Sequence, residues 1–518
     1  MPQPTPLSNA PRRSEQTANA ERFFRRVLAV ATVIVILALA ARLPWIVWSR
    51  HAITDVEAIV SVQSRELANH GILYYDLNQY PYTVAPYGPL WYSSLAALYS
   101  LGAPLLPAGR LLSFAALLGI LLVTWRILWL YTANRYAVWT GTLLVASTAN
   151  VSAWGSLSQS DTLALFFSVA AFYQYSRYRV QPSASALVKC GFLIALAIFT
   201  KQTFAASLTA ILVLLYLGDR RQAVRFTLIL GSLGTAIALG LNWWTEGRYF
   251  QDAITSNMNP FTWENVQQHL TYFVLAAGGL LLMASAGLRH AVKGGLQPFY
   301  VYLIPSVLIW MATAPKVGSD LNYQMETMVI LAWCAAWSLH RLDFFPLLFR
   351  ADRGWVTLLQ IPLFLHMAVN LTNTGNSMFE RIGFEDLRRV ETAQIRPFLE
   401  ATTEPVISVQ IDPLLQTGRR IDVEPMIYNM LVGVGTVDPE PVRKDLAAKK
   451  FAVVVLYQNL FGDDALPEDL EVPSLPESQL EEIRRNYRLA QHVPGPLLNG
   501  TFVYLRAGED EPPPAENP

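Results

Sequence analysis

The sequence contains little charge. Of its 518 residues, 15% are Asp, Glu, Lys or Arg, whereas 53% are hydrophobic. A soluble globular protein carries about 25% charged residues, so the deficit indicates that lipid surrounds most of the chain. The 39 basic and 39 acidic residues cancel. A chain without a basic excess is not expected to bind nucleic acid.

Cysteine and several catalytic motifs are equally scarce. Cys190 and Cys334 are the only cysteines, and both fall inside apolar runs, which argues against a disulfide or a cysteine-based metal site. The histidines show no paired metal-ligand spacing, so a zinc site is not indicated. The sequence has no Walker or dinucleotide-binding loop, which argues against a transporter driven directly by ATP. It also lacks the Gly-x-Ser-x-Gly elbow of serine hydrolases.

The first long apolar run is Val27–Trp48, which follows arginines within residues 22–26. Positive charge beside a span is retained on the cytoplasmic side, so the N-terminus is expected to be cytoplasmic. The Ala-Leu-Ala at 38–40 loosely resembles a cleavage site, which leaves a cleaved signal peptide as the alternative. The run continues past that point and ends in Trp45 and Trp48, which are typical of an interfacial anchor. We therefore favour an uncleaved first span.

Further apolar segments follow, each near the ~20 residues that a bilayer requires. The stretch Pro89–Leu106 is also apolar, but it is short and bracketed by proline. If it lies on the membrane surface or re-enters, every arginine-rich loop falls on the cytoplasmic side, as the positive-inside rule requires. We therefore expect a multi-pass α-helical protein of the cell (inner or plasma) membrane, with about eleven transmembrane helices and an extracytoplasmic C-terminus. The segments centre on 111–130, 136–154, 161–176, 187–200, 204–217, 223–243, 271–288, 298–313, 325–339 and 354–371.

Composition divides the chain into four parts. Residues 1–21 and 508–518 are predicted to be disordered tails, the first of them cytoplasmic. Residues 22–378 form the predicted transmembrane domain, whose first outer loop is 49–109. Residues 379–507 have the composition of a soluble domain, and we expect a small extracytoplasmic α/β domain that acts as a cap or docks an acceptor. Its three predicted strands are Pro405–Ile411, Phe451–Tyr457 and Thr501–Leu505. Its predicted helix is Ser478–Tyr487.

The most informative stretch is Ile53–Trp91, which is polar and rich in Tyr and Pro although it directly follows the first span. Asp55 and Glu57 lie just past the membrane face, where carboxylates are costly and often mark a site. One interpretation is catalysis, with a carboxylate as the general base that deprotonates an acceptor hydroxyl. A second is a divalent cation held by both carboxylates, the one cofactor that the pattern admits. A third is a solvated helix start, where acidic residues are favoured.

Other polar residues expected on the outer face are candidate substrate contacts. Tyr82 and Tyr87 alternate with prolines, and aromatic rings both stack on sugars and anchor at headgroup level, so both roles stay open. Asp161 begins an apolar segment after a polar run, where either a helix cap or a site residue is expected. Lys201, followed by Gln202, lies between two apolar segments. It either binds an anionic group such as a lipid phosphate or snorkels to the interface.

A second informative stretch is an expected outer loop that runs from Lys316 into a span. At the depth of Glu326 a carboxylate requires a partner, and Lys316 is the expected one. A structural ion-pair cluster is the alternative to a binding site. The candidate substrate contacts in this stretch are Lys316, Asp320, Asn322, Tyr323 and Glu326.

Together these motifs resemble a known family. The pattern Asp-x-Glu…His-Gly-Ile-Leu-Tyr…Tyr-Gly-Pro-Leu-Trp-Tyr, which begins at Asp55, and the Arg-Leu-Leu-Ser that opens the next span are similar to the GT-C superfamily. These are polytopic glycosyltransferases that use polyprenyl-phosphate sugars. Within the superfamily the chain most resembles the bacterial protein-mannosyltransferase and aminoarabinose-transferase-like group, over roughly residues 25–375. The resemblance implies that Asp55 is the catalytic base, that Lys201 binds the carrier phosphate and that Asp161 lies near the site. Many members have adjacent Asp-Glu, so whether Glu57 shares the catalytic role stays open.

We therefore expect a membrane glycosyltransferase. It would move a hexose or pentose from a polyprenyl-phosphate carrier to a hydroxyl of a lipid, glycan or protein acceptor at the extracytoplasmic face, with inversion, for the cell envelope or for protein glycosylation. Lys316 is expected to assist Lys201 in holding the carrier phosphate. The alternative is a secondary transporter or lipid-linked glycan flippase, which predicts charges at mid-bilayer and an inverted repeat. A ligase or polymerase that transfers whole lipid-linked glycans is not separable from single-sugar transfer by sequence.

Overall fold

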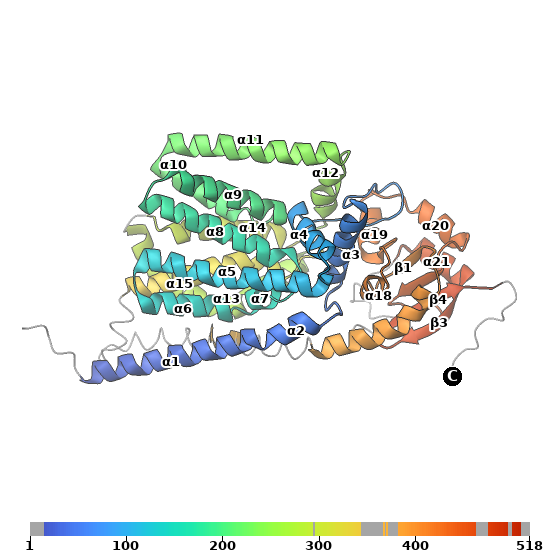
Figure 1. Cartoon of the computed structure of the whole chain (residues 1–518), viewed down its shortest axis with the longest axis horizontal. Coiled ribbons are helices and arrows are strands. Elements are labelled where there is room, and N and C mark those ends of the chain that lie inside the picture. Colours follow the sequence, from blue (N-terminus) through green and yellow to red (C-terminus); the bar gives the residue numbers. More distant parts are fainter. Residues whose placement is uncertain are drawn as a thin grey trace, which may run out of the picture.

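The structure, a computed structural model, describes residues 15–293, 296–342, 366–367, 369–370, 382–462, 475–495 and 500–508. Figure 1 shows long helices running side by side as a bundle, with a smaller sheet-containing domain beyond one end of it. Helix α1 (Glu15–Ala40) begins at the other end of the bundle. The start of the N-terminal helix and the C-terminal domain thus lie at opposite ends of the molecule, which is the relative arrangement that the predicted topology requires.

The predicted membrane spans after the first are helical where the structure describes them, except at Thr148 and at residues 204–205. In the part of the chain that the structure describes, four stretches are long and apolar enough to cross a membrane, namely Glu21–Trp48, Leu105–Thr132, Arg220–Trp244 and Trp263–Lys293. The last predicted segment, 354–371, lies outside the described residues except for four helical positions, so the expected number of about eleven spans stays a prediction. The helices of the bundle are α2 (Arg42–Trp48), α5 (Leu105–Thr132), α6 (Arg135–Ser147), α7 (Ala149–Trp154), α8 (Ser160–Val180), α9 (Ala184–Thr200), α10 (Ala206–Gly218), α11 (Arg220–Trp244), α13 (Trp263–Lys293), α14 (Pro298–Thr313) and α15 (Met325–Arg341).

Side-chain caps fix where several of these helices begin. Asn134, Ser183 and Asp219 each accept a hydrogen bond from a first-turn N–H, at the start of α6, α9 and α11. Such caps satisfy donors that a helix leaves unpaired at its start. Arg177 and Arg179 lie in the last turn of α8, where cations match the negative end of the helix dipole. These signals permit short connections, and residues 181–183 alone join α8 to α9.

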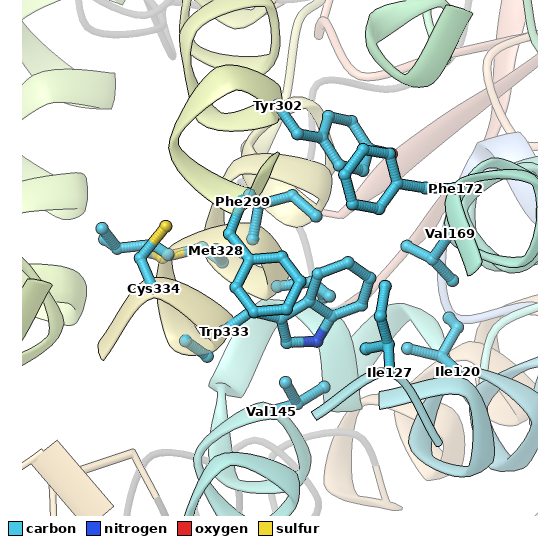
Figure 2. Packing of buried hydrophobic residues seen from close by; sticks show 14 of the residues in the cluster. Ile120, Ile127, Val145, Val169, Phe172, Phe299, Tyr302, Met328, Trp333 and Cys334 are labelled. Atoms are coloured by element: carbon cyan, nitrogen blue, oxygen red, sulfur yellow. The ribbon is translucent and has the colours of Figure 1, made fainter. Parts of the chain in front are cut away.

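Helix α15 forms the centre of the bundle. Every residue of 325–339 is buried, which suits a helix that is apolar on all sides. Trp333 packs against Phe172 and Tyr302 (Figure 2), and its indole N–H donates to Thr124 Oγ1 at 3.0 Å. In contrast, only two of the 25 residues of α11 are buried. The apolar surface of α11 therefore faces outward, as expected of a helix in contact with lipid.

The predicted first outer loop, 49–109, is folded. It contains α3 (Asp55–His70) and α4 (Pro89–Ser100), and its last residues begin α5. Thr54 caps α3, and Pro89 starts α4, where its missing N–H costs no hydrogen bond. The 12 residues of α4 extend about 18 Å, whereas the hydrocarbon core of a bilayer is about 30 Å thick. Helix α4 is therefore too short to cross a membrane by itself.

The C-terminal domain is built on a four-stranded sheet of order β1-β2-β4-β3. Strands β1 and β2 are parallel, and β4 is antiparallel to both of its neighbours. Three strands and one helix match the predicted elements, whereas β3 was not predicted because it buries only its two end residues fully. The domain contains a helix over 382–400, then β1 (Val406–Ser408), α18 (Asp412–Gln416), α19 (Pro425–Gly433), α20 (Glu440–Ala447), β2 (Val453–Leu456), α21 (Glu477–Asn486), β3 (Tyr487–Val493) and β4 (Thr501–Arg506).

The two faces of this sheet contribute to different cores. Val454 and Tyr504 belong to a core with residues of α19, α20 and α21, and Tyr82 of the first loop lies in the same core. Val455 and Val503 belong to a second core, which includes side chains of α3 and of helix 382–400. The C-terminal domain and the first loop therefore share hydrophobic cores, and the sheet packs over the start of α3.

Candidate functional site

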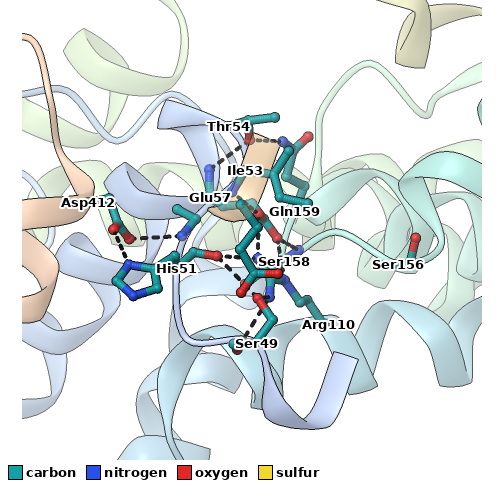
Figure 3. Close-up of polar contacts among 12 residues, drawn as sticks. Ser49, His51, Ile53, Thr54, Glu57, Arg110, Ser156, Ser158, Gln159 and Asp412 are labelled. Carbon is teal, nitrogen blue, oxygen red and sulfur yellow. Dashed lines mark hydrogen bonds and ion pairs between the residues drawn. The ribbon is translucent and has the colours of Figure 1, made fainter. Parts of the chain in front are cut away.

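Glu57, in the first turn of α3, is fully enclosed, and its side chain and that of Arg110 on α5 are both 0% exposed. Figure 3 shows the two side chains facing each other. Arg110 donates to both carboxylate oxygens at 2.9 Å, and the N–H groups of Ser158 (2.7 Å) and Ile53 (3.0 Å) complete the set. Burial raises the pKa of Glu57, but the charge of Arg110 and the hydrogen bonds outweigh burial and hold the pKa below its usual range. Each oxygen already accepts two hydrogen bonds, so neither is free for a substrate proton.

Asp55 begins the same helix but is more open. Its side chain is 36% exposed. Its Oδ1 accepts a hydrogen bond from Nη2 of Arg388 at 3.1 Å, and no described residue donates to Oδ2. Burial raises the pKa of Asp55, the charge of Arg388 opposes the rise, Asp412 adds to it, and the pKa lies above its usual range. Asp55 therefore has a free oxygen and, of the two carboxylates, the greater affinity for a proton.

Lys201 is the centre of a second cluster. Its Nζ donates to Asp161 Oδ1 at 2.7 Å, and Asn322 Nδ2 donates to the same oxygen at 3.0 Å. The rings of Tyr87 and Tyr323 flank the ammonium, with centroids 4.7 and 4.9 Å from Nζ. The Lys201 and Asp161 side chains are 3% and 1% exposed. The fold thus brings five predicted substrate contacts together from four segments, but it pairs the ammonium internally instead of directing it to water.

Gln202 and Lys316 lie beside this cluster. Gln202 Nε2 donates to the carbonyls of Pro86 (2.9 Å) and Ala253 (2.8 Å), which fixes the segment before α4 against the short helix α12 (Arg248–Ala253). Lys316 is half-buried, and its Nζ donates to the Asn257 carbonyl at 3.2 Å. No carboxylate among the described residues forms an ion pair with Lys316. Its charge is therefore less neutralised than that of Lys201.

Glu326 lies in the core of the bundle, apart from Lys316. It accepts hydrogen bonds from Ser168 Oγ at 2.6 Å and from Tyr302 OH at 2.5 Å. The expected pairing with Lys316 is therefore wrong, because hydroxyl groups of α8 and α14 reach the carboxylate first. Asp320 is exposed and caps the short helix η2 (Leu321–Gln324). Its carbonyl accepts a hydrogen bond from the Tyr323 N–H at 3.2 Å, so the Asp320 backbone adjoins the Lys201 cluster, whereas its carboxylate caps η2.

Tyr82 belongs to the core of the C-terminal domain. It is 2% exposed, and its ring lies 5.4 Å from that of Tyr428, centroid to centroid. Its N–H donates to the Asp422 carbonyl at 2.9 Å. A face so enclosed is not available for stacking on a sugar, and the role of Tyr82 in this arrangement is to join the first loop to the domain.

The residue before Asp55 is linked to the Lys201 cluster through the turn that precedes α8. Gln159 Nε2 donates to Thr54 Oγ1 at 3.0 Å, immediately before Asp55 in the chain. Two residues after Gln159, Asp161 pairs with Lys201. The turn before α8 therefore links the start of α3 to the Lys201 cluster.

The two first-loop carboxylates do not form a shared cation site in this arrangement. Glu57 faces Arg110 and Asp55 faces Arg388, so each carboxylate has its own guanidinium. Within the described ranges, no three His, Cys, Asp or Glu side chains are grouped so that they could hold a metal ion. The pair does not fit the expected divalent cation, and we derive no step through one.

Two residues of the site were not predicted individually. Arg110 begins the Arg-Leu-Leu-Ser motif on which part of the resemblance rests, so a signal for it was present. Arg388 lies in a charged stretch beside Arg389, and nothing in the sequence distinguishes the two. Only the fold shows that Arg388 is 1% exposed and in contact with Asp55.

Comparison with known proteins identifies the architecture. No protein-family model matches the sequence, and no curated protein matches it. Among solved structures, ArnT from Cupriavidus metallidurans is similar with a TM-score of 0.60 at 14% identity, over 94% of this chain and 98% of ArnT. The Archaeoglobus fulgidus oligosaccharyltransferase is similar with a TM-score of 0.51 at 14% identity, over 94% of this chain and 74% of that one. The mycobacterial arabinofuranosyltransferase AftD gives 0.52 at 14% identity, over 94% of this chain and 42% of AftD. All three are GT-C glycosyltransferases, and this chain has the GT-C fold.

Proposed function

We propose that this protein is a membrane glycosyltransferase that moves a sugar from a polyprenyl-phosphate carrier to an acceptor hydroxyl. The observation that carries the proposal is the state of Asp55, a carboxylate with a raised pKa, one free oxygen and 36% exposure at the end of a GT-C bundle. A general base needs this combination of proton affinity and access. Two similar structures support the donor class, because ArnT was solved with undecaprenyl phosphate and the oligosaccharyltransferase AglB with a dolichol-phosphate.

The reaction is a single displacement at the anomeric carbon. Oδ2 of Asp55 takes the proton of the acceptor hydroxyl while the hydroxyl oxygen bonds to the anomeric carbon. The bond from that carbon to the phosphate oxygen breaks, and its electron pair leaves with the carrier phosphate. Attack opposite the leaving group inverts the anomeric centre.

The lysines have different roles in this proposal. Lys316 donates to a carbonyl and forms no ion pair with a carboxylate of the described residues, so its charge is available for the carrier phosphate. Lys201 is neutralised by Asp161 and enclosed by two tyrosines. It reaches a phosphate only by exchanging Asp161 for it, so we assign Lys201 first to holding Tyr87 and Tyr323 in position.

The proposed orientation follows from the charge pattern of the sequence. The end of the bundle that bears the C-terminal domain faces the extracytoplasmic side of the cell membrane, because the arginine-rich loops are retained on the other side. A C-terminal reporter that is active only outside the cytoplasm tests this orientation. Activity of a reporter that functions only in the cytoplasm would reverse it.

The function is tested by transfer in liposomes with a panel of radiolabelled polyprenyl-phosphate sugars. Asp55→Asn keeps the shape of the side chain and removes the base, and we expect about 10²–10⁴-fold slower release of polyprenyl phosphate. Asp76→Asn is the matched control, since its carboxylate lies in the same loop and bonds only to Asn78. Full turnover in Asp55→Asn would overturn the assignment of the base. Saturable solute uptake without sugar transfer would favour a transporter instead.

A further inference from the structure

Arg388 connects the C-terminal domain to the candidate base. Its side chain is 1% exposed and lies between two carboxylates. Nη2 is 3.1 Å from Asp55 Oδ1, and Nη1 is 3.6 Å from Glu391 Oε2. Asp55 and Arg388 are 333 residues apart in the sequence. A guanidinium enclosed in this way cannot turn towards water without losing both partners, so its direction is fixed by the fold.

Glu391 is itself fixed by the sheet. Its Oε1 accepts hydrogen bonds from Gln410 Nε2 at 3.0 Å and from Thr501 Oγ1 at 3.1 Å. Thr501 begins β4, and Gln410 follows β1. The chain of contacts from Asp55 through Arg388 to Glu391 therefore ends on the most regular part of the domain.

A second connection holds the residues just before Asp55. Asp412 Oδ1 accepts a hydrogen bond from the Ala52 N–H at 2.8 Å, and its Oδ2 lies 2.8 Å from His51 Nδ1. Thr392 Oγ1 donates to Oδ2 at 2.9 Å. The C-terminal domain thus contacts the start of α3 at two points, one on the backbone and one on the Asp55 side chain.

We propose that Arg388 is a positioning residue for Asp55, so that the C-terminal domain completes the active site in addition to covering it. The inference rests on the proposed function, because it takes Asp55 as the base. By holding Oδ1, the guanidinium leaves Oδ2 as the oxygen that meets the acceptor. Fixed orientation of a reacting group by a rigid neighbour is what efficient catalysis requires.

The charges around Asp55 give Arg388 a second effect. The titratable groups that face this region are Glu391, Asp412 with His51, Glu424 and Tyr457. Burial raises the pKa of Asp55, and the Arg388 charge is the cause that opposes it. Without Arg388, Asp55 would remain among carboxylates and would hold its proton to a higher pH.

The test compares Arg388→Met, Arg388→Lys and the control Arg389→Met in liposome transfer assays between pH 5 and 9. Arg389 is adjacent but its side chain is 64% exposed, and it pairs only with Asp386. For Arg388→Met we expect about 10–100-fold lower kcat at neutral pH, and an acid limb moved up by about one pH unit, with the donor KM unchanged. Arg388→Lys should recover most of the rate, and Arg389→Met should match the wild type. A folded Arg388→Met with wild-type rate and pH profile would overturn the proposal.

Glu391→Gln gives an independent test that keeps the guanidinium. Burial raises the pKa of Glu391 to about 7, so above that pH the variant removes a negative charge that competes for Arg388, and the acid limb should stay in place or move to lower pH. An upward move would contradict the proposal even if Arg388→Met fails to fold. The Asp55→Asn result separates the two levels: an active Asp55→Asn removes the proposed base, whereas an inactive Asp55→Asn beside an unaffected Arg388→Met removes only the role of Arg388.

Discussion

The Glu57–Arg110 pair gives the sharpest prediction about architecture. Both side chains are 0% exposed, and Arg110 also donates to Ser49 Oγ at 2.7 Å and to the His51 carbonyl at 2.8 Å. Arg110→Leu therefore leaves a buried carboxylate with two N–H donors and no cation. Removal of one partner from a buried pair costs about 3–5 kcal/mol, which for a chain of 518 residues corresponds to a melting temperature lower by about 3–5 °C.

The assay is thermal unfolding in detergent, with Arg126→Leu as the control because Arg126 is an exposed arginine of the same helix. The difference in melting temperature between Arg110→Leu and the wild type should become smaller as the pH falls towards 5. Without a cation, burial would raise the pKa of Glu57, and a protonated carboxyl group needs no charged partner. In the wild type, the ionised form of Glu57 stabilises the fold, so the pH dependence has the opposite sign. The pKa of Glu57 lies below its usual range, so its contribution is present above about pH 4.5 and is lost as the pH falls through the folded-state pKa.

Glu57→Gln decides between structure and chemistry. We expect a lower melting temperature and, in the folded fraction, transfer activity within about tenfold of the wild type, because Glu57 acts through packing. An unchanged melting temperature with activity reduced by more than about 10²-fold would refute this reasoning and make Glu57 a catalytic residue.

Three further predictions concern the rest of the site. Lys201→Met leaves the Asp161 carboxylate buried without its cation, and we expect about 3–5 kcal/mol lower stability, measured by thermal unfolding; restoration in the double variant with Asp161→Asn checks the cause. Gly88→Ala would bring a Cβ within 2.0 Å of a backbone oxygen of α9, so transfer activity and melting temperature should both fall, whereas Gly231→Ala, which meets open space, should change neither. Burial raises the pKa of Glu424 to about 7, so stability is lost as the pH rises from about 4.5 to 7, and Glu424→Gln should flatten the melting temperature over that interval; an equally steep dependence would contradict the assignment.

Much of the fold was predictable because membrane helices can be recognised from the local sequence as long apolar segments. The described apolar segments are almost entirely helical, since a segment in lipid must satisfy its backbone hydrogen bonds internally. The strands at 405–411, 451–457 and 501–505 were predictable for a related reason, as buried apolar runs. Strand β3 lacks such a run, and most of its residues are only partly buried. Its strand conformation comes from pairing with β4, which a local pattern does not contain.

The partners of the site residues were less predictable. The sequence marked Asp55, Lys201 and Asp161 as charges in costly positions, and the fold brings the last two within 2.7 Å of each other. The sequence did not identify Arg388, because the burial of an arginine depends on tertiary structure and is not visible in the local sequence. The prediction that Tyr82 contacts substrate rested on an aromatic residue in a proline-rich loop. In the structure the C-terminal domain covers this residue. Coverage by a distant segment is a tertiary property.

In the proposed mechanism, one turn of helix supplies both the general base, Asp55, and a buried structural carboxylate, Glu57. Both carboxylates lie in the first turn of α3, where the helix dipole favours negative charge. Their environments then separate them. Four hydrogen bonds, two of them from Arg110, hold Glu57 ionised, with its pKa below the usual range. Asp55 has one hydrogen-bond partner among the described residues, an oxygen to which none of them donates, and a raised pKa. Groups whose surroundings push their pKa values apart take different roles in catalysis. Because Arg388 of the C-terminal domain is the partner of Asp55, the difference between the two carboxylates depends on the contact between that domain and the membrane bundle.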